Sequence, residues 1–219
     1  MNRAEIEEML AELALQLERA ERLSTEIVAR DIRRFGFRCQ RCGECCRGEE
    51  NTVAVFPLEI RAIMGETGEG WLEAAEPPLE GEWDSGGNFH TLEWRLRKTG
   101  RDCRYFSEGG CRIYGRRPLL CETYPFYLDD GRLRWSECRG IGGEISSEEA
   151  TKLAELLKRR QIFEIREAIE LVRKYEEFER GEPSPFGRCI IHDSEGVHEI
   201  EWAEISGALG RRLRRSGGW

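Results

Sequence analysis

Residues 37–46 read Phe37-Arg38-Cys39-Gln40-Arg41-Cys42-Gly43-Glu44-Cys45-Cys46, with four thiols in eight residues. The C-x-x-C-x-x-C spacing lets one loop wrap several corners of an iron-sulfur cluster, whereas a lone C-x-x-C also occurs in zinc sites and redox pairs. Two overlapping pairs with a fourth cysteine beside them therefore indicate a metal site. In an extended backbone Cys45 and Cys46 would point to opposite sides, so we expect one of them to serve a second centre or to lie outside the first shell.

Four more cysteines follow at wide spacings, which fits ligands recruited singly by folding rather than a second compact loop. Eight thiols would supply two four-thiolate sites, and the spacing does not say which cysteine joins which site. An all-thiolate set suits both structural zinc and iron-sulfur clusters, and the C-x-x-C-x-x-C run favours iron-sulfur. The predicted ligands of the metal or cluster are Cys39, Cys42, Cys45, Cys46, Cys103, Cys111, Cys121 and Cys138.

The three histidines and the ninth cysteine lie away from these groups. We expect His90, His192 and His198 to be surface or strand residues, with His192 facing His198 across a hairpin. Cys189 sits in a short apolar run, where a single cysteine is most often a small buried hydrophobe. None of the four is assigned to the metal site.

Arginine directly flanks seven of the nine cysteines, whereas composition predicts about two. A guanidinium beside a thiolate lowers its pKa and offsets the negative charge of a four-thiolate site. We therefore expect these arginines to compensate the charge of the centre. They are Arg38, Arg41, Arg47, Arg104, Arg112, Arg139 and Arg188.

Composition excludes several classes of protein. A net charge of -8 argues against broad attraction to nucleic acid or to an anionic membrane. The N-terminus alternates charged residues with leucine and lacks the apolar stretch of a secretory signal or membrane span, so we expect a cytoplasmic protein. In that reducing compartment, an odd count of nine cysteines favours metal ligation over disulfides.

The hydrophobic pattern predicts an α+β fold that is mainly helical, with a small irregular cysteine-rich metal-binding core and short strands or a hairpin. Apolar residues at helical spacing predict one amphipathic helix over residues 4–34 that ends near Gly36. A short β-branched and aromatic run over 52–56 precedes a short helix over 57–64 with proline in its first turn. Residues 65–90 are rich in Gly, Glu and Pro and predict a solvated loop, anchored by Trp71 and Trp83. Residues 90–97 alternate as a strand.

The C-terminal third predicts a long helix and a hairpin. Ser146 and Glu149 form a capping-box signature before an amphipathic stretch that predicts a helix or a broken helix to about Arg180. Residues 189–191 and 197–202 then flank a turn as two short strands. The expected divisions are an N-terminal helix over 1–36, a cysteine-cluster metal-binding domain over 37–143, a helical segment plus hairpin over 144–205, and a basic tail over 206–219.

Beyond the cysteine count, the motifs and their order resemble a known family. Four segments are similar to the YkgJ-type cysteine-cluster family. They are the run from Phe37 to Cys46, Cys103-Arg-Tyr-Phe106, Gly110-Cys111-Arg-Ile-Tyr114-Gly-Arg-Arg117-Pro118 and Cys121-Glu-Thr-Tyr124-Pro125-Phe126. These C-x-x-C-x-x-C-C proteins are described as zinc- or iron-chelating. The resemblance covers residues 37 to about 140 and implies metal binding through the cysteines, often with an iron-sulfur oxidoreductase activity, without fixing a reaction.

The segment between the later cysteines has a physical interpretation of its own. Arg117-Pro118 predicts a turn that delivers Cys121, and Tyr124-Pro125-Phe126 predicts aromatic packing that shields the cluster from solvent. A catalytic role for Tyr114 or Tyr124 is the weaker interpretation, because no base lies nearby in the sequence.

Three functions fit this sequence. The leading hypothesis is an iron-sulfur protein that transfers electrons or performs a cluster-dependent redox step, which leaves open whether the chain is an enzyme. The alternatives are a structural zinc module for protein interaction and a metal-delivery protein. In each case we expect a protein partner to bind the N-terminal helix or the helix over 144–180, and we expect neither nucleic acid nor a membrane to be bound.

Overall fold

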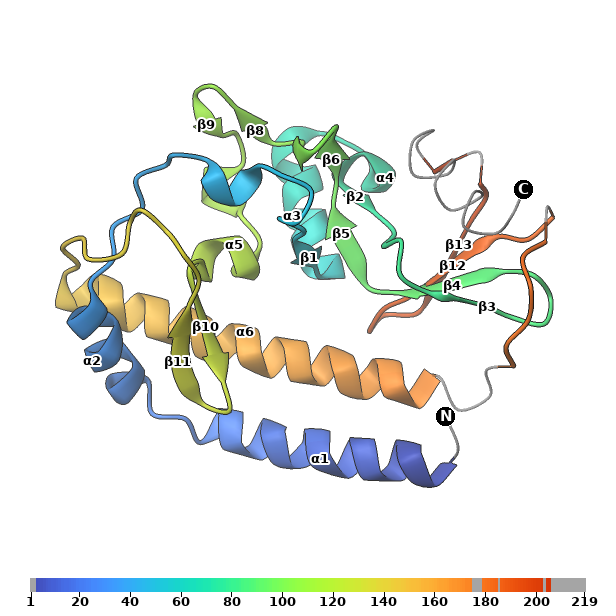
Figure 1. Ribbon diagram of the computed structural model, residues 1–219, viewed down its shortest axis with the longest axis horizontal. Helices are drawn as coiled ribbons and strands as arrows, with labels where there is room; N and C mark the ends of the chain where they lie inside the picture. Colours follow the sequence, from blue (N-terminus) through green and yellow to red (C-terminus); the bar gives the residue numbers. More distant parts are fainter. Residues whose placement is uncertain (1–2, 175–178, 185, 203, 206–219) are drawn as a thin grey trace.

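The computed structural model describes residues 3–174, 179–184, 186–202 and 204–205, which form an α+β fold (Figure 1). Its longest helix, α6 (Ser147–Lys174), runs alongside α1 (Arg3–Glu21). Most of the small sheets lie on the opposite side of α6 from α1, whereas the hairpin over residues 126–135 crosses α6 and reaches α1, where Asp130 pairs with Arg19. Among the described residues, no helix has both the length and the apolar character needed to cross a membrane. The α+β class predicted from the sequence is confirmed.

The predicted N-terminal helix is two helices, so the expectation of a single one is wrong. After α1 ends, the hydroxyl of Ser24 accepts a hydrogen bond from the N–H of Ile27 and caps the start of α2 (Thr25–Phe35). The predicted end at Gly36 is confirmed, because its φ is 72° and its N–H donates to the carbonyl of Ile32.

Two small sheets form one end of the molecule. In the first, β5 (Trp94–Leu96) pairs antiparallel with β1 (Ala54–Val55) and β2 (Ala75–Glu76). In the second, β4 (Phe89–Leu92) pairs antiparallel with β3 (Glu82–Trp83) and parallel with β12 (Cys189–His192), which forms the predicted hairpin with β13 (Val197–Ile200).

Three further hairpins and the remaining short helices complete the described elements. The hairpins are β6 (Lys98–Thr99) with β7 (Asp102–Cys103), β8 (Phe106–Ser107) with β9 (Gly110–Cys111), and β10 (Phe126–Asp129) with β11 (Arg132–Trp135). The helices are α3 (Pro57–Thr67), α4 (Trp71–Ala74) and α5 (Leu119–Thr123), with 3-10 turns η1 (Glu44–Cys46) and η2 (Tyr114–Arg116). The predicted proline in the first turn of α3 is confirmed.

The predicted solvated loop over 65–90 is wrong, because α4, β2 and β3 form there. Its tryptophans do anchor the segment: the ring centroid of Trp71 lies 5.5 Å from that of Trp94, and that of Trp83 lies 5.2 Å from that of Phe89. The predicted strand over 90–97 is interrupted at Glu93, whose φ of 61° separates β4 from β5.

The predicted capping box is confirmed. The hydroxyl of Ser146 accepts the N–H of Glu149, and the Glu149 carboxylate accepts the N–H of Ser146. The predicted helix end near Arg180 is wrong, because Arg180 forms a β-bridge with Asp84. Residues 175–178 and the predicted basic tail over 206–219 lie outside the described residues.

The predicted contact between His192 and His198 is also wrong. In the hairpin register His192 pairs with Val197, and Ile191 pairs with His198. Neighbouring pairs in a strand point to opposite faces, so the two imidazoles lie on opposite faces. His192 instead contacts the His90 ring at 2.8 Å.

Two hydrophobic clusters stabilise the described part of the chain. The first joins the two sheets to α3 and includes Ile60, Trp94 and Ile191, whereas the second joins α2, β10 and α6 through Ile32 and Leu157. Each cluster combines residues from more than one of the segments that the sequence suggested. The segments that carry the clustered cysteines run between these two cores.

Asp193 is a buried carboxylate at the hairpin turn, 1% exposed, that accepts hydrogen bonds from Trp94 Nε1 and from the N–H groups of Glu195 and Gly196. We expect Asp193→Ala to lower the free energy of unfolding by about 3 kcal/mol, because the buried indole N–H of Trp94 and two partly buried backbone N–H groups lose their acceptor. Urea denaturation measures the change. Asp129→Ala removes a carboxylate that is 62% exposed and should cost about 0.5 kcal/mol or less. Equal losses in the two variants would contradict this account.

Candidate metal centre

All eight cysteines predicted to bind metal line one pocket of about 160 Å³. The lining set is Cys39, Cys42, Cys45, Cys46, Cys103, Cys111, Cys121 and Cys138. All nine cysteines are free thiols. Cys189 is fully buried in β12 and packs in the first hydrophobic cluster, as the sequence predicts for a small hydrophobe. The fold therefore assembles thiols that lie up to 99 residues apart in sequence.

The first cysteine loop is shaped by Gly43. Its φ of 74° lies in the left-handed region, and a Cβ placed there would lie 2.1 Å from Cε2 of Phe106. Only glycine therefore allows the Phe106 ring to pack on this loop. The 3-10 turn η1 then begins at Glu44 and carries Cys45 and Cys46.

The turn corrects our expectation that Cys45 and Cys46 point to opposite sides. That expectation assumed an extended backbone, whereas η1 brings their sulfur atoms to 4.0 Å from each other. In a tetrahedral site with bonds of about 2.3 Å, two thiolates lie about 3.8 Å apart. The two sulfurs are thus close enough to bind one ion.

Backbone N–H groups point at three of the later thiols. Cys103 accepts hydrogen bonds from the N–H groups that follow it in the chain, and the Cys111 thiol accepts one from Ile113. The N–H of Gly140 lies 3.4 Å from the sulfur of Cys138. Such hydrogen bonds favour a charged thiolate and tune the electron density of a metal-bound sulfur.

The thiols form two groups by their electrostatic influence on one another. Cys103, Cys111 and Cys121 lie in the first, and the charges of neighbouring thiolates raise their pKa values. The second surrounds Cys138, whose pKa is raised by the charges of Cys42 and Cys39 after the larger effect of burial. The charge of Cys45 raises the pKa values of thiols in both groups.

Burial is the largest influence on four of the eight thiols, Cys103, Cys111, Cys121 and Cys138. Desolvation raises their pKa values, so their neutral forms are favoured without metal. In the Cys45–Cys46 pair the hydrogen bond between the two thiols has the largest effect, and it lowers the pKa of Cys45. In this pair, Cys45 ionises first and Cys46 retains its proton, since its own pKa is raised by the same contact.

One arginine that does not directly flank a cysteine acts on three of these thiols. The charge of Arg117 lowers the pKa values of Cys45, Cys111 and Cys121, and its guanidinium lies 3.7 Å from the ring centroid of Tyr114. The sequence signal was the Arg117-Pro118 pair, which we interpreted only as a turn. Arg117 directly precedes this proline and lines the same pocket as Cys121, the cysteine that follows the turn.

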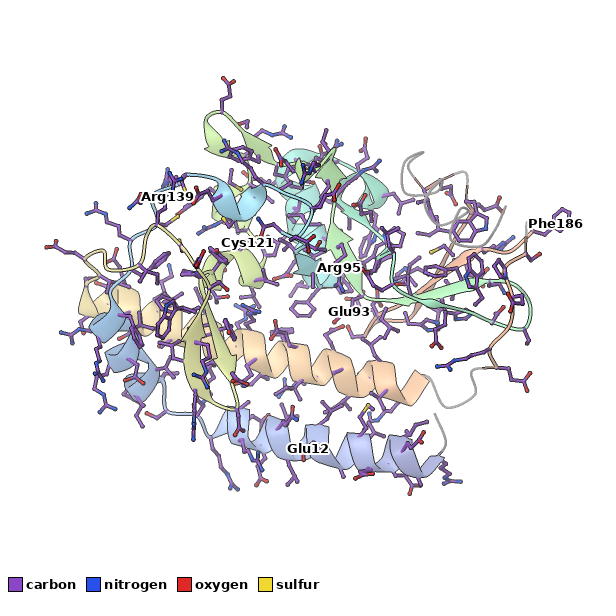
Figure 2. All side chains as sticks on the ribbon, viewed as in Figure 1. Glu12, Glu93, Arg95, Cys121, Arg139 and Phe186 are labelled. Atoms are coloured by element: carbon purple, nitrogen blue, oxygen red, sulfur yellow. The ribbon has the colours of Figure 1, made fainter. Side chains whose placement is uncertain are left out.

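Charge compensation by the flanking arginines is borne out for Arg112, whose charge lowers the pKa of Cys111. Arg104 and Arg139 instead form ion pairs with Glu69 at 2.9 Å and Glu44 at 2.5 Å, and Arg188 pairs with Glu199. Figure 2 labels Cys121 on α5 and Arg139 in the segment after β11. Neighbours in sequence therefore need not be neighbours of the sulfur.

The tyrosines of the pocket have structural partners. The Tyr124 hydroxyl donates to the carbonyl of Glu137 at 2.6 Å, and the Tyr114 ring lies under the guanidinium groups of Arg41 and Arg117. These contacts agree with packing roles. The three histidines do not line the pocket, in keeping with the sequence interpretation.

The donor set suits a metal, although the thiols do not surround one point. Within the described ranges, no three His, Cys, Asp or Glu side chains converge closely enough to hold a single ion. Eight thiols, several hydrogen-bonded by backbone N–H groups, are nevertheless the ligands that zinc and iron-sulfur clusters use. The residues present therefore fit either group in chemistry.

Comparison with known proteins gives one match. A family model described as CxxCxxCC, putative zinc- or iron-chelating domain, matches residues 38–155. The match begins in the first cysteine loop and extends into α6. No curated protein and no solved structure matches the chain.

Gly43 and Gly48 offer a matched test of the first cysteine loop. Both have positive φ, but a Cβ at Gly48 meets nothing within 4 Å. We expect Gly43→Ala to cost about 3 kcal/mol of folding free energy and to weaken metal binding about tenfold, because the ring of Phe106 must move. Gly48→Ala should cost about 1 kcal/mol and leave binding intact. Thermal unfolding and metal titration measure both. Similar metal affinities in the two variants would rule out the proposed role of the Phe106 contact.

Proposed function

The chain belongs to the CxxCxxCC family of zinc- or iron-chelating domains, and we propose that its pocket cysteines hold iron-sulfur and support electron transfer or a cluster-dependent redox step. The observation that carries this proposal is the presence of all eight predicted thiols in one pocket. When bound, an iron-sulfur cluster supplies reversible one-electron chemistry. The ligands would be Cys39, Cys42, Cys45, Cys46, Cys103, Cys111, Cys121 and Cys138.

The surroundings of the thiols support a redox role. Proteins tune the reduction potential of a cluster through hydrogen bonds to its sulfurs, nearby charge and burial. Here the corresponding features are the backbone N–H groups at Cys103, Cys111 and Cys138, the charge of Arg117 and the burial of Cys121. The two electrostatic groups of thiols would supply the ligands of two centres, with Cys45 acting on both. Binding would draw each group closer together.

Zinc is the second candidate, and one distance favours it. The 4.0 Å between the sulfurs of Cys45 and Cys46 is near the edge of a single-ion tetrahedron. A protein of this kind would use metal to hold the cysteine segments together and would present its helices to a partner. Zinc has no redox chemistry, so the two candidates differ in a measurable property.

The deciding measurement is the content of iron, zinc and acid-labile sulfide in protein purified without oxygen and without added metal. A visible spectrum before and after dithionite accompanies it. We expect iron with matching sulfide and a colour that dithionite bleaches, because cluster iron changes its oxidation state. Colourless protein with tightly bound zinc would replace the redox proposal with the structural one.

Cys121 and Cys189 provide a pair for testing the ligand assignment, because Cys121 is half-buried and lines the pocket, whereas Cys189 is buried and lies outside it. We expect Cys121→Ser to lower metal affinity by more than the ~10-fold typical of losing an outer-shell partner. Cys189→Ser should retain the metal content of the parent protein. Metal analysis after gel filtration measures both, and unchanged metal in Cys121→Ser would remove Cys121 from the ligand set.

Metal uptake should be coupled to proton release. Burial raises the pKa values of Cys103, Cys111, Cys121 and Cys138 above the ordinary 9.0, so these thiols carry protons at neutral pH without metal. Metal displaces those protons, so the affinity of the metal-free protein for Zn²⁺ should rise by about tenfold or more per pH unit between pH 6 and 8. Competition with a chromophoric chelator measures it. An affinity independent of pH would contradict the assignment of protonated thiols as ligands.

A further inference from the structure

A second, larger hollow lies beside the cysteine pocket. It is an open groove of about 1110 Å³ between the last turn of α2, residues 36–41 and the segment that leads into α6. The groove shares Cys39, Arg41 and Tyr114 with the cysteine pocket. A molecule bound in the groove would therefore contact the rim of the proposed metal centre.

Four exposed arginines line this groove: Arg33, Arg34, Arg38 and Arg41. In the described part of the chain, none of them forms an ion pair within 4.0 Å, whereas most other described arginines do. In a chain of net charge -8, four guanidinium groups without a close ion-pair partner on one surface are a marked departure from the rest of the molecule.

Acidic residues in the groove offset only part of this charge. Glu149 already caps α6 through the N–H of Ser146, and the charge of Arg38 contributes to its lowered pKa. Glu144 is the other carboxylate of the lining. Arg33 and Arg34 lie in the last turn of α2, where positive charge interacts favourably with the helix dipole, but that interaction leaves their guanidinium groups exposed. The lining keeps a positive balance of two charges, four arginines against two glutamates.

We propose that this groove binds an acidic polypeptide segment of a partner protein. This inference deepens the proposed function, since it names the chemistry of the partner that would meet the metal centre. Three observations favour a polypeptide over a small anion. The groove is open, its volume exceeds the range of about 300–1,000 Å³ typical of small-molecule pockets, and its arginines are exposed rather than gathered in a buried cradle.

The charge of the whole chain also limits the choice of ligand. A long nucleic acid would extend beyond the groove and meet the acidic remainder of the surface, whereas a short acidic segment would meet only the groove lining, whose charge is positive by two. Exposed charges are screened by salt, so binding should weaken as ionic strength rises. The position of Cys39 in the shared wall places a docked segment next to the thiols.

The test uses the full metal-loaded protein and a fluorescein-labelled decaglutamate peptide, with binding followed by fluorescence anisotropy at low and high salt. We expect Arg33→Glu/Arg34→Glu to weaken peptide binding about tenfold at low salt, because two attractive charges become repulsive. The control, Arg101→Glu/Arg132→Glu, changes net charge equally at exposed residues outside the groove and should leave binding near the parent value. Arg33→Gln/Arg34→Gln gives an intermediate loss and serves if charge reversal unfolds α2.

Several outcomes would overturn the proposal. They are equal losses in groove and control variants, no loss in either groove variant with intact circular dichroism, and no peptide binding to the parent protein. Tighter binding of inorganic phosphate or of a single-stranded oligonucleotide than of the peptide would assign the groove to another ligand. Metal content is measured in each preparation. Peptide binding by protein that takes up no metal would therefore refute the proposed function while leaving the groove assignment intact.

Discussion

Packing on two separate hydrophobic cores holds the cysteine segments around one pocket. Cys103, Cys111 and Cys121 pack against the cluster built on the two sheets and α3, whereas Phe37 and Ile141, which flank the other cysteine segments, pack on α2, β10 and α6. A pocket bounded by two cores can collect thiols from distant parts of the chain. The contact of Phe106 with the Gly43 backbone joins the first cysteine loop to the later cysteines, since Phe106 begins β8.

Burial of thiols has an electrostatic cost that the surrounding residues reduce. Desolvation and mutual repulsion disfavour thiolates at Cys103, Cys111 and Cys121, while backbone N–H groups at two of them and the charge of Arg117 act in the opposite direction. A bound cation would remove the remaining repulsion, so the pocket is better suited to a metal-bound state than to a set of free thiolates. Because the thiols must lose their protons when they bind metal, the affinity of the pocket for metal depends on pH.

The pocket and the arginine groove form a continuous surface through Cys39, Arg41 and Tyr114. One side supplies thiols and the other supplies exposed positive charge, and the Tyr114 ring contacts the guanidinium groups of Arg41, which lines both hollows, and of Arg117, which lines the cysteine pocket. This arrangement links a metal centre to a docking surface without a long path between them. It agrees with the proposal of a protein partner and identifies α2 and the start of α6 as the elements that would contact it.

The sequence alone determined the family, the α+β class and the eight cysteines that meet in the pocket, because thiol spacing and motif order are local properties of the chain. It also determined the end of α2 at Gly36 and the capping box of α6, which depend on residues only a few positions apart. Only the tertiary structure decided that Cys45 and Cys46 share one side and that Arg117 influences the pocket more widely than most arginines beside the cysteines. It also decided that Arg33, Arg34, Arg38 and Arg41 share one groove. These are contacts between segments far apart in sequence or angles set by packing, and no local pattern encodes them.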